Sequence, residues 1–310
     1  MSPMDEAIIR QICHLAFDEY PTLIQRCAEG IGNYVYMVEC DGSRYGIRCS
    51  GEKGAYRETV RWLKRLGEMD IPVPQVIKRG SFQHYEYLIL SWLEGRDIGL
   101  VYTQLTRDEK KTIAREIVRI QNEVAALEPE DIPPDWSWLS FVHEMLDRAE
   151  ARIIQNGYFD AESCRRLRVE IEKLDEYFSA VRPVAYLDDI SSKNLLIHNG
   201  RLSGIIDVDQ MGFGDKLTYV ALTYMALLNM EYDTDYVNYI LEEMELSREQ
   251  RRAFIFYALM YCVDFMGERG MSFMDKTVEV SPQIIDRLER IYDTLWEQWC
   301  EGSENAAFTP

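Results

Sequence analysis

The sequence is poor in the residues that build metal–thiolate sites and disulfide frameworks. Its 310 residues include seven cysteines and four histidines, all scattered along the chain and without a Cys-x-x-Cys pair. This distribution argues against a structural zinc site and against a disulfide framework. Reduced, mostly buried thiols are instead typical of cytosolic proteins.

Long apolar runs and an excess of positive charge are also missing. No stretch approaches about eighteen consecutive apolar residues, so we expect no membrane-spanning helix. The first residues carry neither the basic nor the apolar region of a secretory signal, so we expect a cytoplasmic protein. Acidic residues number 53 against 34 basic ones, a formal net charge of -19. That balance argues against nucleic acid as a partner, because phosphate backbones need clustered basic residues. It would favour a cationic ligand through long-range attraction, and an acidic surface that serves only solubility is the competing interpretation.

Residues 1–90 have the pattern of a small sheet with one helix. Short apolar segments predict strands at 22–27, 33–40, 43–49, 73–79 and 85–90. The pair Asp41-Gly42 predicts a tight turn between the second and third strands. One apolar stripe with helical spacing predicts a helix over 54–66.

The rest of the chain is mainly helical. Capping boxes at 106–109 and 247–250, and a serine–proline pair at 281–282, mark helix starts. Helical periodicity covers 106–127, 141–154, 162–178, 217–230, 247–266 and the segment after 281. We therefore predict an α+β fold of two lobes, in which a hinge at 91–95 joins a small β-rich N-terminal lobe at 1–90 to a larger helical C-terminal lobe at 96–310.

The most informative stretch is Asp189-Ile-Ser-Ser-Lys-Asn194, which places a carboxylate and an amide five residues apart. A hairpin is predicted next, because two short apolar strands flank the tight-turn pair Asn199-Gly200. A second carboxylate, Asp207, follows the hairpin. Magnesium-assisted phosphoryl transfer needs one carboxylate to orient or deprotonate a hydroxyl, and an amide and another carboxylate to hold the metal on nucleotide phosphates. The stretch therefore predicts a kinase-type active site.

Each of these residues receives a role in that hypothesis. We assign Asp189 as the catalytic base or orienting group, because the five-residue step to Asn194 selects it over the adjacent Asp188. Asn194 and Asp207 are the predicted Mg²⁺ ligands, since magnesium prefers hard oxygen donors. A bound cation would also compensate the cost of burying the Asp207 carboxylate behind an apolar run. The sequence leaves open whether Asp209 faces the same site or solvent.

The N-terminal lobe offers a candidate nucleotide site. Arg48, on the strand after the Asp-Gly turn, would neutralise the α- and β-phosphates and pair with Glu58 on the following helix. Gly30 and Gly32 precede the second strand, where their backbone amides would approach the phosphates. A surface arginine without a role and a plain turn are the competing interpretations of these two features.

With these residues placed, the chain resembles the aminoglycoside phosphotransferase family, a branch of the protein-kinase-like fold. Within that family it looks most similar to hygromycin B phosphotransferases. The similarity runs from about residue 29 through the helices after Asp215. Its most specific segments are Tyr-Gly-Ile-Arg at 45–48, Ile-Pro-Val-Pro at 71–74 and the stretch 189–215, which contains Asn-Gly-Arg-Leu-Ser-Gly-Ile-Ile-Asp.

The resemblance implies transfer of the γ-phosphoryl group of ATP or GTP to a hydroxyl group of a small molecule. It implies that Asp189 is the catalytic residue and that Arg48 takes the position of the nucleotide-binding lysine. It also implies that Ser91, Trp92 and Leu93 lie beside the purine.

Three positions depart from the family's pattern. Leu187 stands where the family usually has a histidine two residues before the catalytic Asp, a histidine that mainly supports the loop. Tyr219 stands where a structural carboxylate is frequent. The phosphate loop has Asn33-Tyr34 in place of a serine at its tip.

We therefore expect a cytoplasmic small-molecule kinase that uses Mg²⁺ with ATP or GTP. Its acceptor would be aminoglycoside-like or another cationic polyhydroxyl compound, and the sequence leaves open whether antibiotic resistance is the biological role. Asp264 and Glu268, acidic residues of the C-terminal helices, are candidates for holding that acceptor. Two alternatives stay open: a metabolic kinase acting on choline, homoserine, a sugar or a fructosamine, and a catalytically weak nucleotide-binding module. The oligomeric state is not indicated.

Overall fold

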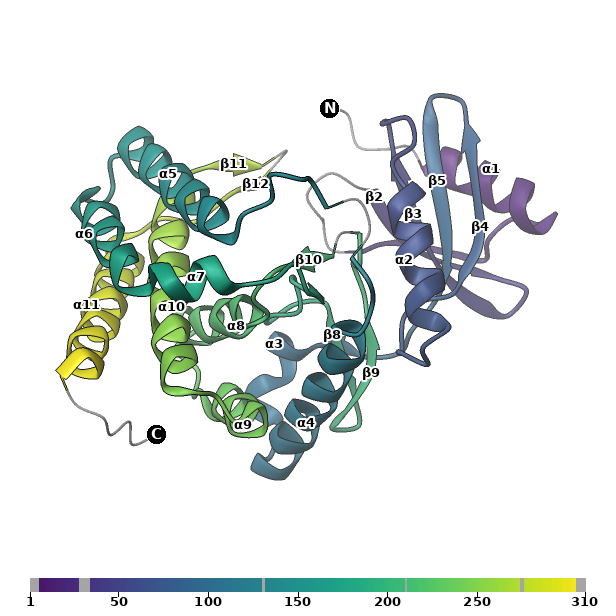
Figure 1. Ribbon diagram of the computed structural model, residues 1–310. Helices are drawn as coiled ribbons and strands as arrows, with labels where there is room; N and C mark the ends of the chain where they lie inside the picture. Colours follow the sequence, from purple (N-terminus) through teal and green to yellow (C-terminus); the bar gives the residue numbers. More distant parts are fainter. Residues whose placement is uncertain (1–5, 28–33, 130–131, 210, 274–275, 305–310) are drawn as a thin grey trace. The chain divides into compact units, whose positions relative to one another are not determined.

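The computed structural model describes residues 6–27, 34–129, 132–209, 211–273 and 276–304 (Figure 1). Its contacts divide the chain into two compact units. The first consists of Met1–Arg96, Leu196–His198 and Ser203–Gln210, and the second of Asp97–Leu195, Asn199–Leu202 and Met211–Pro310. One unit is built around an antiparallel sheet and the other is mainly helical, so the predicted α+β class is confirmed. The lobe and hinge boundaries stay a prediction.

An antiparallel sheet of five strands forms the first unit, in the order β1-β2-β3-β5-β4. The strands are β1 (Leu23–Arg26), β2 (Tyr34–Cys40), β3 (Ser43–Ser50), β4 (Val76–Phe82) and β5 (Tyr85–Ser91). The predicted turn at Asp41-Gly42 joins β2 to β3, with Cys40 opposite Ser43. Two helices, α1 (Glu6–Phe17) and α2 (Arg57–Gly67), flank the sheet (Figure 1).

Side chains alternate across this sheet, and the alternation decides where Arg48 points. Ile47 and Cys49 of β3 belong to a buried cluster that includes Ile9 and Ile12 of α1. Because successive strand residues face opposite sides of a sheet, Arg48 faces away from α1. The strand therefore fixes the direction in which Arg48, the predicted nucleotide contact of this unit, points.

Two elements of the first unit begin later than predicted. The helix predicted over 54–66 begins at Arg57, because Gly54 has a φ of 80°, a left-handed conformation that a right-handed helix cannot include. The strand predicted over 73–79 begins at Val76, since the two preceding prolines cannot donate ladder hydrogen bonds.

Helix α1 was not predicted at all. Its buried residues Ile9, Ile12 and Cys13 have the spacing of one helical face, and all three are fully buried. The signal was therefore present in the sequence, but it lies in a stretch without a capping box.

The second unit is built around α10. Its helices are α3 (Ile98–Val101), α4 (Arg107–Val124), α5 (Trp138–Asn156), α6 (Glu162–Glu170), α7 (Asp175–Ala180), α8 (Leu217–Asn229), α9 (Asp235–Met244), α10 (Arg248–Glu268) and α11 (Pro282–Glu304). Helix α10 packs against α5, α8 and α11, and α4 packs against α9 (Figure 1). Every residue of α10 from Ala253 to Met260 is buried. Within the described ranges, no helix combines the length and the apolar character needed to cross a membrane.

Local signals place the starts of two long helices correctly. Thr106 and Glu109 form a reciprocal capping box at the start of α4, and Ser247 and Gln250 form another at the start of α10. The single helix predicted over 162–178 is wrong, because 3₁₀ turn η2 (Ile171–Leu174) separates α6 from α7. The buried residues Ile171 and Leu174 are three apart, a spacing that a 3₁₀ turn aligns on one side.

Short strands complete the fold. Strands β6 (Arg96–Asp97), β8 (Leu195–His198) and β9 (Arg201–Ile205) form a sheet in the order β6-β8-β9, and the predicted hairpin of β8 and β9 is confirmed. Asn199 and Gly200 have φ values of 50° and 72°, as a type I′ turn requires. Strand β7 (Ala185–Tyr186) pairs with β10 (Gly212–Phe213), and β11 (Ser272–Phe273) pairs with β12 (Lys276–Thr277).

Gly214, which follows β10, has no room for a side chain. Its φ of 142° favours glycine, and a Cβ there would lie 2.0 Å from Cζ3 of Trp138. We expect Gly214→Ala to lower the free energy of unfolding by about 2 kcal/mol or more, from strain and overpacking together. Urea denaturation measures this loss. The control is Gly157→Ala, because Gly157 has a φ of 68° but open space around it; an equal loss in both variants would contradict the steric argument.

Candidate functional site

The loop between β7 and β8 carries Asp189, and the structure distinguishes it from Asp188. Asp189 is exposed, whereas Asp188 is half-buried. Burial raises the pKa of Tyr186 and of Tyr261, and the nearby Asp188 carboxylate adds to both shifts. Asp188 therefore belongs with the buried tyrosines of the second unit, while Asp189 is presented to solvent, as a residue that meets a ligand must be.

Asn194 closes this loop. Its Nδ2 donates to the backbone oxygen of Asp189 at 2.8 Å, and its N–H donates to Oδ1 of Asp97 at 2.9 Å. An amide nitrogen can only donate hydrogen bonds, so Oδ1 is the side-chain atom of Asn194 that can bind a cation. Asn194 has a φ of 69°, a left-handed conformation that asparagine tolerates better than most residues and that clusters at functional sites.

Two further contacts fix the backbone around Asp189. The buried side chain of Gln121, on α4, donates from Nε2 to the oxygen of Leu187 at 2.8 Å, and its Oε1 accepts from the N–H of Leu187 at 2.9 Å. The N–H of Gly99 donates to the oxygen of Ser192 at 3.0 Å. Sequence reasoning missed both contacts, and the one available signal was a polar residue within the apolar stripe of α4.

In the first unit, Arg48 forms a charged cluster with Asp207 and Asp209. Both terminal nitrogens of its guanidinium bind the Asp209 carboxylate, Nη1 at 2.7 Å from Oδ1, and Nη1 also lies 3.3 Å from Oδ1 of Asp207. Thr59 of α2 donates from Oγ1 to the same Asp209 oxygen at 3.0 Å. Burial is the largest single influence on the pKa of Arg48 and would lower it, but the Asp209 and Asp207 carboxylates together oppose burial and the pKa is raised. Arg48 is therefore a fixed, permanently charged group, and Asp209 is its main partner.

The predicted pairing of Arg48 with Glu58 is wrong. Glu58 lies on the exposed side of α2, where it pairs with Arg61 at 2.7 Å. Consecutive helix residues face different directions, so Glu58 and Thr59 cannot both face the sheet. Thr59 is 2% exposed and shares the buried stripe of α2 with Trp62. The threonine, not the glutamate, therefore reaches the charged cluster.

Asp207 and Asn194 offer the hard oxygen donors that magnesium prefers. Asp207 also has a left-handed φ, of 61°. Partial removal from water raises the pKa of Asp207 while Arg48 opposes the shift, and a divalent cation would likewise favour the ionised form. Among the residues that the structure describes, no three His, Cys, Asp or Glu side chains form a metal cluster, but an ion shared with nucleotide phosphates needs fewer protein ligands. Each of the two side chains supplies an oxygen donor of the kind that suits Mg²⁺, and their roles as ligands of one ion stay predictions.

The predicted hinge, 91–95, is tied to strand β9 within the first unit. Oγ of Ser203 donates to the backbone oxygen of Glu94 at 2.6 Å. Trp92 and Leu93 are half-buried. The place of Ser91, Trp92 and Leu93 beside a purine stays a prediction.

Two groups of predicted site residues receive no support. Asp264 is buried on α10 and pairs with Arg152 of α5 at 3.2 Å, and Glu268 lies 3.9 Å from the same guanidinium. These ion pairs join α5 to α10 and so give both carboxylates a structural role, while their predicted role in holding a cationic acceptor stays a prediction. Gly30 and Gly32, the predicted phosphate loop, lie outside the described residues.

Asp215, at the end of the most specific segment, is a buried structural acceptor. It accepts hydrogen bonds from the hydroxyls of Tyr177 and Tyr257, the second at 3.0 Å, and from the N–H of Leu217 at 3.0 Å. These bonds tie the first turn of α8 to α7 and α10. The carboxylate that ends the segment therefore supports the fold of the second unit.

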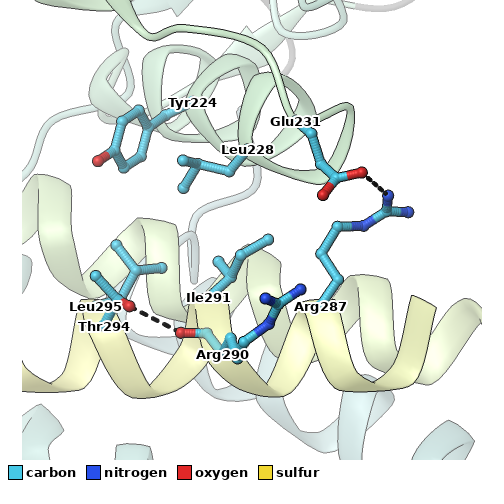
Figure 2. A pocket seen from close by; sticks show the side chains of 8 residues that line it. All are labelled: Tyr224, Leu228, Glu231, Arg287, Arg290, Ile291, Thr294 and Leu295. Atoms are coloured by element: carbon cyan, nitrogen blue, oxygen red, sulfur yellow. Dashed lines mark hydrogen bonds and ion pairs between the residues drawn. The ribbon is translucent and has the colours of Figure 1, made fainter. Parts of the chain in front are cut away.

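A separate pocket of about 270 Å³ lies between α8 and α11 (Figure 2). Leu228 of α8 lines it together with Ile291 and Leu295 of α11. An ion pair of 3.1 Å between Arg287 and Glu231 closes one end (Figure 2). None of the predicted site residues lines this pocket, so it is distinct from both groups described above.

Comparison with known proteins relates the whole chain to phosphotransferases. The phosphotransferase enzyme family model matches residues 24–254. A thermostable mutant of aminoglycoside phosphotransferase APH(4)-Ia, in its apo form, is similar with a TM-score of 0.69 and 17% identity, over 96% of this chain and 100% of that one. A further variant of that mutant, in ternary complex with AMP-PNP and hygromycin B, is similar with a TM-score of 0.65 and 15% identity. The similarity covers 96% of this chain and 99% of that one.

A further similar structure comes from Haemophilus somnus 129PT and is described as a putative fructosamine-3-kinase. Its TM-score is 0.62 and its identity 14%, over 94% of this chain and 97% of that one. No curated protein sequence matches the chain. At these identities the structural likeness establishes the fold alone, and it confirms the predicted kinase-like fold of aminoglycoside phosphotransferases.

Proposed function

The chain belongs to the phosphotransferase enzyme family, and from this premise we propose that it is a cytoplasmic kinase of small cationic molecules. It transfers the γ-phosphoryl group of ATP or GTP to a hydroxyl group of an aminoglycoside-like acceptor. The observation that carries the proposal is the exposed Asp189 on a loop that the Asn194 side chain closes. A carboxylate that orients a hydroxyl must be accessible and well positioned, and the exposure of Asp189 and the hydrogen bond that holds its backbone oxygen support this role.

Each of these residues has its own role in the proposed reaction. Asp189 orients the acceptor hydroxyl and takes up its proton as the new bond to phosphorus forms. Arg48, fixed by Asp209, presents its charge to the nucleotide phosphates without first having to be ordered. Asn194 and Asp207 would hold a magnesium ion, and the ion would supply positive charge to neutralise the transferring phosphoryl oxygens.

Charge supports a cationic acceptor. The formal net charge of -19 attracts polyamines such as aminoglycosides over long range, and the similar APH(4)-Ia complex contains AMP-PNP and hygromycin B. A metabolic kinase is the second candidate, because the similar structure from Haemophilus somnus 129PT is described as a putative fructosamine-3-kinase.

Nucleotide binding gives the first test. We expect Mg²⁺ with ATP or with GTP to raise the melting temperature, since a ligand at about one hundred times its Kd adds about 2.7 kcal/mol of stability. Differential scanning fluorimetry with each nucleotide, with Mg²⁺ and with EDTA, distinguishes the two donors and shows the metal requirement. Absence of stabilisation by both magnesium nucleotides would contradict the proposal.

Turnover gives the second test. Release of the nucleoside diphosphate is followed with a panel of aminoglycosides, fructosamines, choline, homoserine and sugars. Turnover of an aminoglycoside supports the proposed acceptor, and turnover of a metabolite alone supports the metabolic kinase. Nucleotide binding without turnover on the whole panel supports a catalytically weak nucleotide-binding module instead.

A further inference from the structure

The backbone of Leu187 needs a partner that β10 cannot supply. Leu187 directly follows β7, two residues before Asp189, and is 2% exposed. On the side of β10, the oxygen of Val184 accepts from the N–H of Gly214 at 2.9 Å. Because successive strand residues direct their hydrogen-bonding groups to opposite edges, the N–H and the oxygen of Leu187 point away from β10.

Gln121 satisfies both of these groups. Its Nε2 lies 2.8 Å from the Leu187 oxygen and its Oε1 lies 2.9 Å from the Leu187 nitrogen. The glutamine is 1% exposed, so water cannot take its place without opening the packing of α4. The Gln121 amide thus makes the two hydrogen bonds that a neighbouring strand would otherwise make. Its loss would leave the buried N–H and the buried oxygen of Leu187 unpaired.

The segment from Leu187 to Asp189 is consequently held at both ends. Gln121 fixes the residue at its start, and the Nδ2 of Asn194 fixes the oxygen of Asp189 at its end, at 2.8 Å. A shift of the backbone at Leu187 would therefore change the direction of the Asp189 carboxylate. The aliphatic side chain of Leu187 can neither donate nor accept a hydrogen bond, so it adds no polar support to the loop itself.

We propose that Gln121 is a positioning residue for phosphoryl transfer, which aims Asp189 by holding the backbone of Leu187. The inference rests on the proposed function, because it matters to catalysis only if Asp189 orients the acceptor. Its expected signature is a fall in kcat without a change in nucleotide binding. Gln121 lies on α4 in the second unit, while the predicted nucleotide contact Arg48 belongs to the first.

Two matched methionine variants test the proposal. Q121M removes the amide, and K110M removes another buried polar group of α4, whose ammonium pairs with Asp233 at 2.7 Å. We expect Q121M to lower kcat by about tenfold to a hundredfold with the nucleotide KM unchanged within about twofold. K110M should lose thermal stability and keep its kcat.

Hydrogen–deuterium exchange supplies a readout that does not depend on activity. In Q121M the amides of 187–195 should exchange at least about tenfold faster than in wild type, and in K110M they should not.

If the wild-type protein turns over no acceptor, the proposed function fails, and the exchange rates still decide whether Gln121 holds the loop. Wild-type kcat in Q121M, or loop exchange no faster than in K110M, would overturn the proposal. If Q121M does not fold, Q121E is used instead, because its carboxylate keeps an oxygen that can accept from the Leu187 N–H. We expect Q121E also to lower kcat and to leave the nucleotide KM unchanged. A wild-type kcat in Q121E would overturn the proposal.

Discussion

Replacing Asp189 by Asn is expected to lower kcat by about a hundredfold to ten-thousandfold. Asparagine has the same size as aspartate, but its neutral amide cannot take up the proton of an acceptor hydroxyl. The side chain is exposed and Asn194 holds the loop through the backbone oxygen of residue 189, so folding should be unchanged. The Kd of the nucleotide should stay within about twofold, because the predicted phosphate contacts come from other residues. Single-turnover phosphoryl transfer and calorimetric nucleotide titration measure the two quantities.

Asp188→Asn is the matched control for this experiment. It makes the same chemical change one residue earlier, at a carboxylate that is half-buried near Tyr186. We expect it to affect stability more than kcat, because its neighbours are buried tyrosines. Wild-type kcat in Asp189→Asn, or a larger loss of kcat in Asp188→Asn, would contradict the assignment of the catalytic carboxylate.

The elements that could be predicted are those whose signals are local. The Asn199-Gly200 turn and the capping box that begins at Thr106 depend on residues within a few positions of one another, and the structure has them where the pattern puts them. The break at η2 within 162–178 was not predicted, because the apolar spacing continues through it while the backbone hydrogen bonds change. Apolar periodicity indicates which face of a helix is buried. It does not distinguish the backbone hydrogen bonds of an α-helix from those of a 3₁₀ turn.

The residues of the candidate site likewise fall into those that a local sequence pattern can predict and those that it cannot. Asp189, Asn194 and Asp207 come from one continuous stretch whose spacing already suggests chemistry, and their roles remain predictions. The contacts that hold such residues come from far along the chain. Gln121 and Leu187 are 66 residues apart, and Thr59 and Asp209 are 150 apart. No spacing rule connects such pairs, because only the folded chain brings them together.

The two carboxylates beside Arg48 should give different defects when each is changed to an amide. Asp209 uses both oxygens on Arg48 and one of them also on Thr59, whereas Asp207 contacts Arg48 through Oδ1 alone, at 3.3 Å, and its side chain is 48% exposed. Asp207 is therefore the carboxylate that can also bind a metal ion. We expect Asp207→Asn to lower kcat by about a thousandfold and to raise the Mg²⁺ concentration needed for half-maximal activity.

Asp209→Asn should leave that Mg²⁺ requirement unchanged and raise the nucleotide KM by about tenfold, because Arg48 loses a bidentate, charged partner and with it a fixed direction. It should also lower the free energy of unfolding by about 2 kcal/mol, since a buried guanidinium then keeps one neutral acceptor at residue 209 and the longer charged contact to Asp207. Initial rates over a matrix of Mg²⁺ and nucleotide concentrations separate the two effects. If Asp209→Asn shifts the Mg²⁺ requirement and Asp207→Asn does not, the roles are exchanged: Asp209 is then the metal ligand, and its pairing with Arg48 belongs to a state that the metal must open before transfer.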